Sequence, residues 1–84
     1  MPYIKIGRRK ELENDIENLA EKIMGAGELN FVIFSLVKRL IGEGYEYASL
    51  NMVMGVFESC KLEFYRRVVV PDEELKITEN GDIK

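Results

Sequence analysis

Residues 28–41 read Glu-Leu-Asn-Phe-Val-Ile-Phe-Ser-Leu-Val-Lys-Arg-Leu-Ile, and the rest of the fold prediction follows from them. Their apolar residues recur at spacings of three and four, which is the pattern of an α-helix. At about 100° per residue these residues cover an arc of about 200°, interrupted by Asn30, and Phe31 lies outside even that arc. A helix so widely apolar is normally central to a larger core, so this one needs apolar partners on more than one side.

Glycines separate this segment from two further helical segments. Gly25-Ala26-Gly27 precedes it and Gly42-Glu43-Gly44 follows it, and both runs are typical of helix ends. Residues 7–24 carry one apolar stripe, formed by Leu12, Ile16, Leu19, Ala20 and Ile23. A third helix begins at a Ser49 or Asn51 cap and ends near Val69, because Pro71 disfavours continuation. The prediction is a small all-α domain of three helices, about 7–24, 28–41 and 50–69, with short extended N- and C-terminal segments.

The two ends of the chain have a different pattern. Tyr3–Ile6 and Leu75–Thr78 alternate weakly, as short strands do. Residues 71–84 carry five acidic and two basic side chains, so this tail alone equals the net charge of −3. Asn80-Gly81 is a hairpin turn signal, but that hairpin would set Glu79 against Asp82. We therefore favour an irregular acidic tail over a hairpin.

Composition excludes several classes of site. A chain of 84 residues is short enough that one compact domain is expected. It has no histidine, which removes the commonest metal ligand and neutral-pH base. Its single cysteine, Cys60, falls at an apolar position of the third helix, and we interpret it as a small buried hydrophobic residue.

No motif for catalysis or cofactor binding is present in the sequence. The run from Gly25 to Asn30 lacks the third glycine of a dinucleotide-binding loop, and the tail lacks the ligands of a calcium loop. The carboxylates of Asp72, Glu73 and Glu74 are expected to be solvated. An enzyme would require Glu58, Lys61, Glu63 or Tyr65 to gather in a pocket. We therefore predict no enzyme, no cofactor and no metal site.

The apolar surface predicts self-association. The third helix adds a stripe of its own, formed by Val53, Phe57, Cys60, Phe64 and Val68. Three short helices cannot readily cover all of this surface, and soluble monomers rarely expose a patch of that size. We predict a twofold homodimer whose candidate interface comprises Phe31, Phe34, Val37, Ile41, Met52 and Val56. The alternative is that the extended terminal segments cover this surface.

Several polar residues are candidates for contacts at or near the apolar surfaces. Asn30 and Lys61 fall inside the apolar arcs. In one interpretation Asn30 caps the glycine turn and Lys61 extends its ammonium into water. In the other they form a buried, register-setting pair or part of a pocket, with Glu58 or Glu63 as charge partner. The candidate polar contacts are Asn30, Lys61, Glu63, Arg66 and Arg67.

Nucleic-acid binding is the alternative function. Arg8-Arg9-Lys10, Lys38-Arg39 and Arg66-Arg67 would neutralise several phosphates if the fold brought them together. The connection from Gly42 to Ala48 is longer than a helix-turn-helix allows, however. Adjacent glutamates also favour surface ion pairs, such as Glu63 with Arg67.

The longest apolar run, Phe31–Phe34, is far shorter than the roughly 20 residues of a membrane span. The N-terminal residues also lack the pattern of a secretion signal. We expect a cytoplasmic protein that does not enter membranes.

The block Lys-Leu-Glu-Phe-Tyr-Arg-Arg-Val-Val at 61–69, followed by Pro71 and by Glu79-Asn80-Gly81-Asp82, resembles a family of short uncharacterised proteins encoded in bacterial, archaeal and phage genomes. Arg8-Arg9-x-Glu11-Leu12, Gly27-x-Leu29-Asn30-Phe31 and Asn51 fit the same pattern. The resemblance covers nearly the whole chain and implies a small cytoplasmic or phage-associated accessory factor. Asp72 and Lys84 stand where that pattern has aromatic residues. No site residue is implied by the resemblance.

Overall fold

The computed structural model describes residues 2–83, and this range is helical over most of its length. The helices are α1 (Ile6–Lys22), α2 (Ala26–Ile41), α3 (Tyr47–Phe64) and α4 (Val70–Asn80), with a π-helical segment, Tyr65–Val69, between the last two. No strand occurs in the range described. The all-α prediction is confirmed. The described chain divides into two units, residues 2–51 and residues 52–83, which we treat separately.

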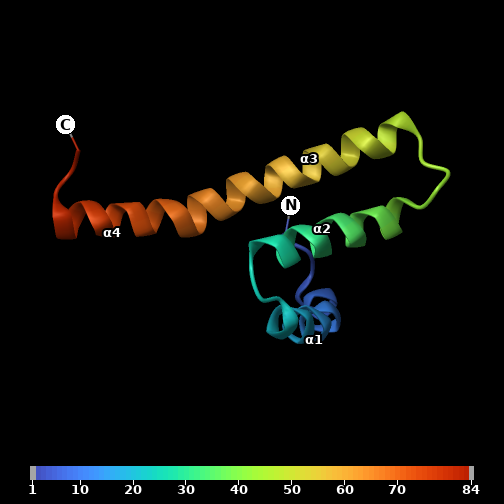
Figure 1. Ribbon diagram of the computed structural model, residues 1–84, viewed down its shortest axis with the longest axis horizontal. Coiled ribbons are helices and arrows are strands. Elements are labelled where there is room, and N and C mark those ends of the chain that lie inside the picture. The colour runs from blue at the N-terminus through green and yellow to red at the C-terminus, as the bar shows by residue number, and fades with distance from the viewer. Residues whose placement is uncertain (1, 84) are drawn as a thin grey trace. The chain divides into compact units, whose positions relative to one another are not determined.

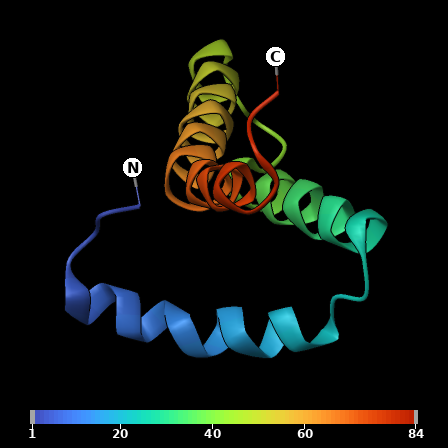
Figure 2. The same ribbon diagram turned by 90° about the vertical axis from the view of Figure 1, so that its left-hand side faces the viewer.

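In the first unit, α1 and α2 are separate helices joined by a short turn (Figure 2). The turn contains Gly25, whose extended backbone starts α2. The Glu28 carboxylate of α2 accepts a hydrogen bond from the backbone N–H of Met24, in the turn that precedes the helix, at 2.9 Å. The predicted cap is therefore wrong in its residue, because Asn30 lies inside α2 and Glu28 makes the contact.

The C-terminus of α2 is fixed by a glycine in the left-handed region. Gly42 has φ +68°, and its N–H donates to the Lys38 carbonyl at 3.1 Å. Residues with a Cβ rarely adopt this conformation, so the glycine predicted as a helix stop serves as one. The guanidinium of Arg39 adds a hydrogen bond to the Ser35 carbonyl at 3.2 Å.

The α3 helix, most of which belongs to the second unit, continues into the π-helical segment and α4 without a break, and we call this helical run the rod (Figure 1). The prediction that Pro71 ends the third helix is wrong. Proline removes a donor and its ring clashes with the carbonyl four residues earlier in a regular α-helix. The preceding turn is widened instead, with the Val70 N–H bonded to the Tyr65 carbonyl five residues back. Pro71 is then the second residue of α4, directly after the widened turn.

The acidic tail is helical as far as Asn80, so neither the irregular tail nor the hairpin is correct over 71–80. The α-helix extends through Leu75–Thr78, where we expected a strand, and ends at Gly81, which has φ +84° and donates to the Ile77 carbonyl at 2.8 Å. Residues 2–5 are non-helical and form no strand. Lys84 lies outside the described residues.

The helix bounds otherwise agree with expectation to within a few residues. The third helix begins at Tyr47, before either predicted cap, and the Glu46 carbonyl accepts from the Ser49 N–H at 3.0 Å. The first two helices begin at Ile6 and Ala26, against expected starts near 7 and 28.

Candidate protein-association surface

The α2 helix presents its apolar side chains to solvent. Phe31 is 70% exposed and Phe34 is 66% exposed, although both belong to the most apolar segment of the sequence. Val37 and Ile41 are half-buried. The other large exposed residues of this helix are Leu29, Ile33, Leu36 and Leu40. The other residues of the unit 2–51 therefore leave the apolar side chains of α2 largely uncovered.

The same holds for the predicted interface residues of α3, taken by themselves. Met52 and Val56 are each more than half exposed. Phe64 of the same helix and Tyr65 of the π-helical segment are also more than half exposed. Neither residues 2–51 nor residues 52–83, each taken as a unit by itself, have a buried side chain.

The exposure of apolar side chains is clearest for the aromatic residues. All eight aromatic side chains of the chain are exposed, namely Tyr3, Phe31, Phe34, Tyr45, Tyr47, Phe57, Phe64 and Tyr65. Aromatic residues contribute much of the energy of protein interfaces, because each buries a large area at little cost in side-chain entropy. One of these rings, Tyr45, lies 5.4 Å from the Lys38 ammonium, within cation–π range.

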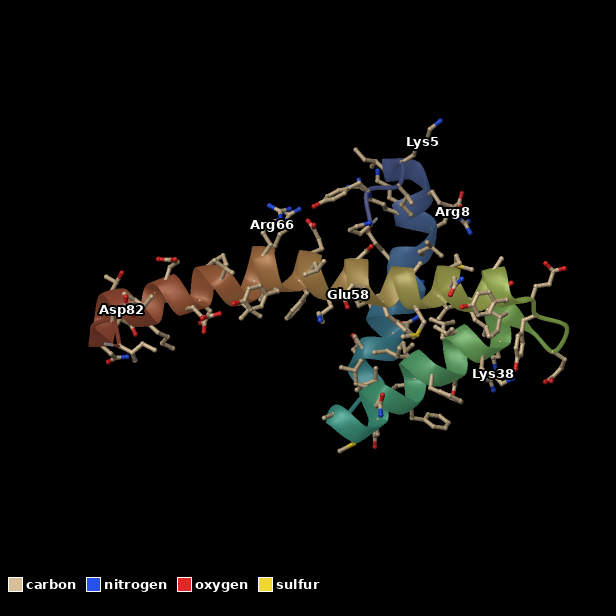
Figure 3. All side chains as sticks on the ribbon, turned by 90° about the horizontal axis from the view of Figure 1, so that it is seen from above. Lys5, Arg8, Lys38, Glu58, Arg66 and Asp82 are labelled. Carbon is tan, nitrogen blue, oxygen red and sulfur yellow. The ribbon has the colours of Figure 1, made fainter. Side chains whose placement is uncertain are left out.

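The candidate polar residues of the rod form short-range surface contacts. Lys61 pairs with Glu58 at 3.2 Å, and both side chains are mostly exposed. Glu63 accepts from Arg66 at 2.7 Å and lies 3.8 Å from the Arg67 guanidinium, as the i,i+4 spacing predicts. Figure 3 shows Arg66 projecting outward from the rod. The exposure of Lys61 agrees with the interpretation in which its ammonium extends into water.

Cys60 requires a correction. The sequence places it on the apolar stripe of the third helix, but the thiol is free and exposed, so the prediction of a buried side chain is wrong for the single chain. The stripe exists as predicted, since Phe57 and Phe64 lie one turn to either side of Cys60. Sequence reasoning locates the stripe and does not show what covers it.

The basic clusters contact groups of their own chain. In α1, Arg8 pairs with Glu11, and Arg9 donates to the Ile4 carbonyl at 2.6 Å. Arg66 and Arg67 likewise contact Glu63 of their own chain, and their side chains stay more than half exposed.

Two further properties concern membranes and metals. None of the helices in residues 2–83 combines the length and the hydropathy that crossing a bilayer requires. Over the same range, the acidic and cysteine side chains form no group of three that is able to hold a metal ion. Asp72, Glu73 and Glu74 thus remain a run of exposed carboxylates.

Comparison with known proteins gives one match. The model of a family described as a domain of unknown function (DUF6899) matches residues 1–83. The comparisons with curated proteins and with solved structures found no match.

Proposed function

This chain belongs to the DUF6899 family, and we propose that it acts through protein association, as a helical homodimer that uses the apolar surface of α2. The observation that carries the proposal is the exposure of Phe31 and Phe34, at 70% and 66%. Removing a large apolar side chain from water is worth about 1.5–3 kcal/mol. The α2 helix has several such side chains, so a second copy would bury enough apolar surface to bind.

The interface centres on Phe31, Phe34, Val37 and Ile41, which recur along α2 at spacings of three and four residues. A twofold dimer is the simplest assembly, because one self-complementary patch then covers both copies. Met52 and Val56 of α3 are the remaining predicted interface residues, and both are exposed.

A second copy is favoured over an unrelated protein by the chemistry of the patch. Within residues 29–37 of α2 there is no charged side chain, so an equally apolar surface matches it best, and α2 of another copy is such a surface. The resemblance of the sequence to bacterial, archaeal and phage proteins supports an accessory role for this dimer, in the cytoplasm.

The experiment is a pair of matched alanine variants followed by analytical ultracentrifugation. Phe34→Ala removes an aromatic ring from the proposed interface, whereas Tyr47→Ala removes a ring outside it that is somewhat more exposed. We expect Phe34→Ala to raise the dimer dissociation constant by about 30-fold or more, as at an interface hot spot. Tyr47→Ala will leave it within about threefold. Equal effects of the two variants would contradict an interface centred on α2.

Nucleic-acid binding remains the alternative function, and it is tested by filter binding at low salt. The phosphate contribution is strongest there, so retention of DNA or RNA that falls steeply with added salt would favour it. The acidic net charge of −3 and the ion pairs of Arg66 and Arg67 lead us to expect no retention.

A further inference from the structure

We propose that α2 packs antiparallel against α2 of a second copy, with the twofold axis of the pair at Phe34. This inference rests on the proposed dimer and gives its α2 contact a direction and a register. Every residue that takes part belongs to one helix, Ala26–Ile41, and therefore to one of the two units.

One face of α2 is symmetric in spacing about Phe34. Residues three, four and seven positions before Phe34, and the same numbers of positions after it, share a helical face with it, because these spacings return close to full turns. At about 100° per residue they fall within an arc of about 120° centred on Phe34. We call this face the seam, and its residues are Gly27, Asn30, Phe31, Phe34, Val37, Lys38 and Ile41.

The seam is separate from a second apolar face of α2. That second face lies on the other side of the helix and consists of Leu29, Ile33, Leu36 and Leu40. Both aromatic residues of α2, Phe31 and Phe34, belong to the seam and are mostly exposed. A partner on the seam therefore covers the two rings and leaves the second face for other contacts.

Side-chain sizes along the seam favour the antiparallel direction. An axis at Phe34 places this ring against its own copy and sets Gly27 of one copy opposite Ile41 of the other. No atom lies within 4 Å of a Cβ built on Gly27, so this position has open space for the partner's Ile41. A parallel pair would set the two copies of Gly27 against each other and leave a gap at that end, which is costly in an apolar contact.

The charges at the two ends of α2 favour the same direction. Glu28 lies in the first turn, and Lys38 and Arg39 lie in the last turn. Glu28 lies beyond the edge of the seam on the side of Lys38, and in the antiparallel pair it is offset from the partner's Lys38 by only about 3 Å along the axis. The long lysine side chain therefore reaches the carboxylate. A parallel pair would set each charge near its own copy and align the two helix dipoles, and both effects are repulsive.

Glu28 and Lys38 are available for this contact. No ion pair joins either of them to another residue in the range 2–83. One oxygen of the Glu28 carboxylate accepts from the Met24 N–H, and the carboxylate keeps its charge. The Lys38 ammonium lies near the Tyr45 ring, a contact that also leaves its charge in place. Figure 3 shows Lys38 toward the C-terminal end of α2.

Disulfide trapping in the full-length chain tests the direction. Two variants in a Cys60→Ser background carry Gly27→Cys and Ile41→Cys, respectively. Bridged cysteines need Cα atoms within about 7 Å, so we expect the mixture, oxidised with glutathione disulfide, to form a heterodimer linked from 27 to 41. Each variant alone will form less than about a tenth as much cross-linked dimer, because position 27 lies about 21 Å along the axis from its own copy. Mass spectrometry of the peptides identifies the linked positions.

Charge reversal is a second test that needs no new cysteine. Glu28→Lys alone and Lys38→Glu alone each set like charges at both symmetric contacts, and we expect either change to raise the dimer dissociation constant about fivefold at low salt. The double variant exchanges the two charges and will return to within about twofold of the native chain. It carries the effects of both changes on α2 itself, so its recovery comes from pairing between copies. Glu17→Lys on α1 is the control and will leave the dissociation constant unchanged.

The outcomes separate this inference from the proposed dimer. A dimer in which the variants alone form 27–27 and 41–41 links, or in which no 27–41 link forms, would overturn the antiparallel seam and leave the proposed dimer intact. A double charge variant that dissociates as readily as the single ones would do the same. A native chain that sediments as a monomer would instead refute the proposed dimer, and with it this inference.

Discussion

The α1 and α2 helices are nearly equal in length but differ in how much of their surface is charged and how much is apolar. Nine of the 17 residues of α1 are charged, whereas α2 has three among 16. Leu12, Ile16 and Leu19 confine the apolar surface of α1 to one stripe. The apolar surface of α2 extends around most of its circumference, and Phe31 lies beyond the main arc. One-sided packing suits α1, whereas α2 requires cover on opposite sides.

The two helices also differ in the residues and hydrogen bonds that fix their ends. Glycines flank α2 at Gly25 and Gly42, and the Glu28 side chain bonds to the backbone before the first turn. α1 is flanked by Lys5 and Ile23, and Lys5 makes no capping side-chain hydrogen bond. The helix that needs association most is therefore also the one whose ends are fixed more strictly by local structure.

The largest effect is expected when one charge is placed on each helix, on the side away from its main apolar stripe. This tests whether that side of α2 is in contact and that side of α1 is solvated. Phe31→Asp puts a carboxylate on α2 where we expect contact with a second copy. We expect the dissociation constant to rise by about 100-fold or more in sedimentation equilibrium, because a buried unpaired charge is costly. Asn18→Asp, on the polar side of α1, will have no measurable effect. If neither substitution changed the dissociation constant, this side of α2 would be exposed to solvent in the dimer, as the polar side of α1 is.

A smaller effect is expected at the end of α2. Gly42→Ala forces a Cβ into the left-handed region at φ +68°, which costs roughly 1–2 kcal/mol. The matched change Gly7→Ala lies in α1 at a position with no atom within 4 Å of the added Cβ, and will stabilise by about 0.5–1 kcal/mol. Chemical denaturation followed by circular dichroism measures both. A stabilising Gly42→Ala would show that the glycine stop does not limit α2.

The smallest expected effect concerns the start of α2. Glu28→Ala removes the carboxylate that accepts from the Met24 N–H, and we expect a loss of about 0.5–1 kcal/mol in the free energy of unfolding. Glu28→Gln keeps an acceptor oxygen and will lose less. If Glu28→Ala and Glu28→Gln were equally destabilised, charge near the helix dipole and not the hydrogen bond would be responsible.

Much of the fold follows from sequence patterns, and the exceptions have identifiable causes. The spacing of apolar residues and the glycine runs locate the first two helices, because both signals are local. The C-terminal third differs from the sequence prediction because Pro71 does not end the helix. A single π-helical turn accommodates that proline, and no residue in Tyr65–Val69 predicts such a turn.

The candidate surface was predictable in part, for a related reason. Periodicity shows which residues of α2 share a face, and the structure leaves Phe31 and Phe34 of that set exposed. Periodicity does not show what covers a face, so Cys60 was expected to be buried and is exposed in the single chain.

The central claim is that a second copy of the chain buries the apolar surface of α2. Sedimentation equilibrium of the native protein over a range from about 0.1 to 100 µM, with circular dichroism on the same samples, tests it most directly. We predict a reversible monomer–dimer equilibrium in which helical signal increases with the fraction of dimer. A chain that stays monomeric throughout, and still unfolds cooperatively from a fully helical state, would contradict the claim.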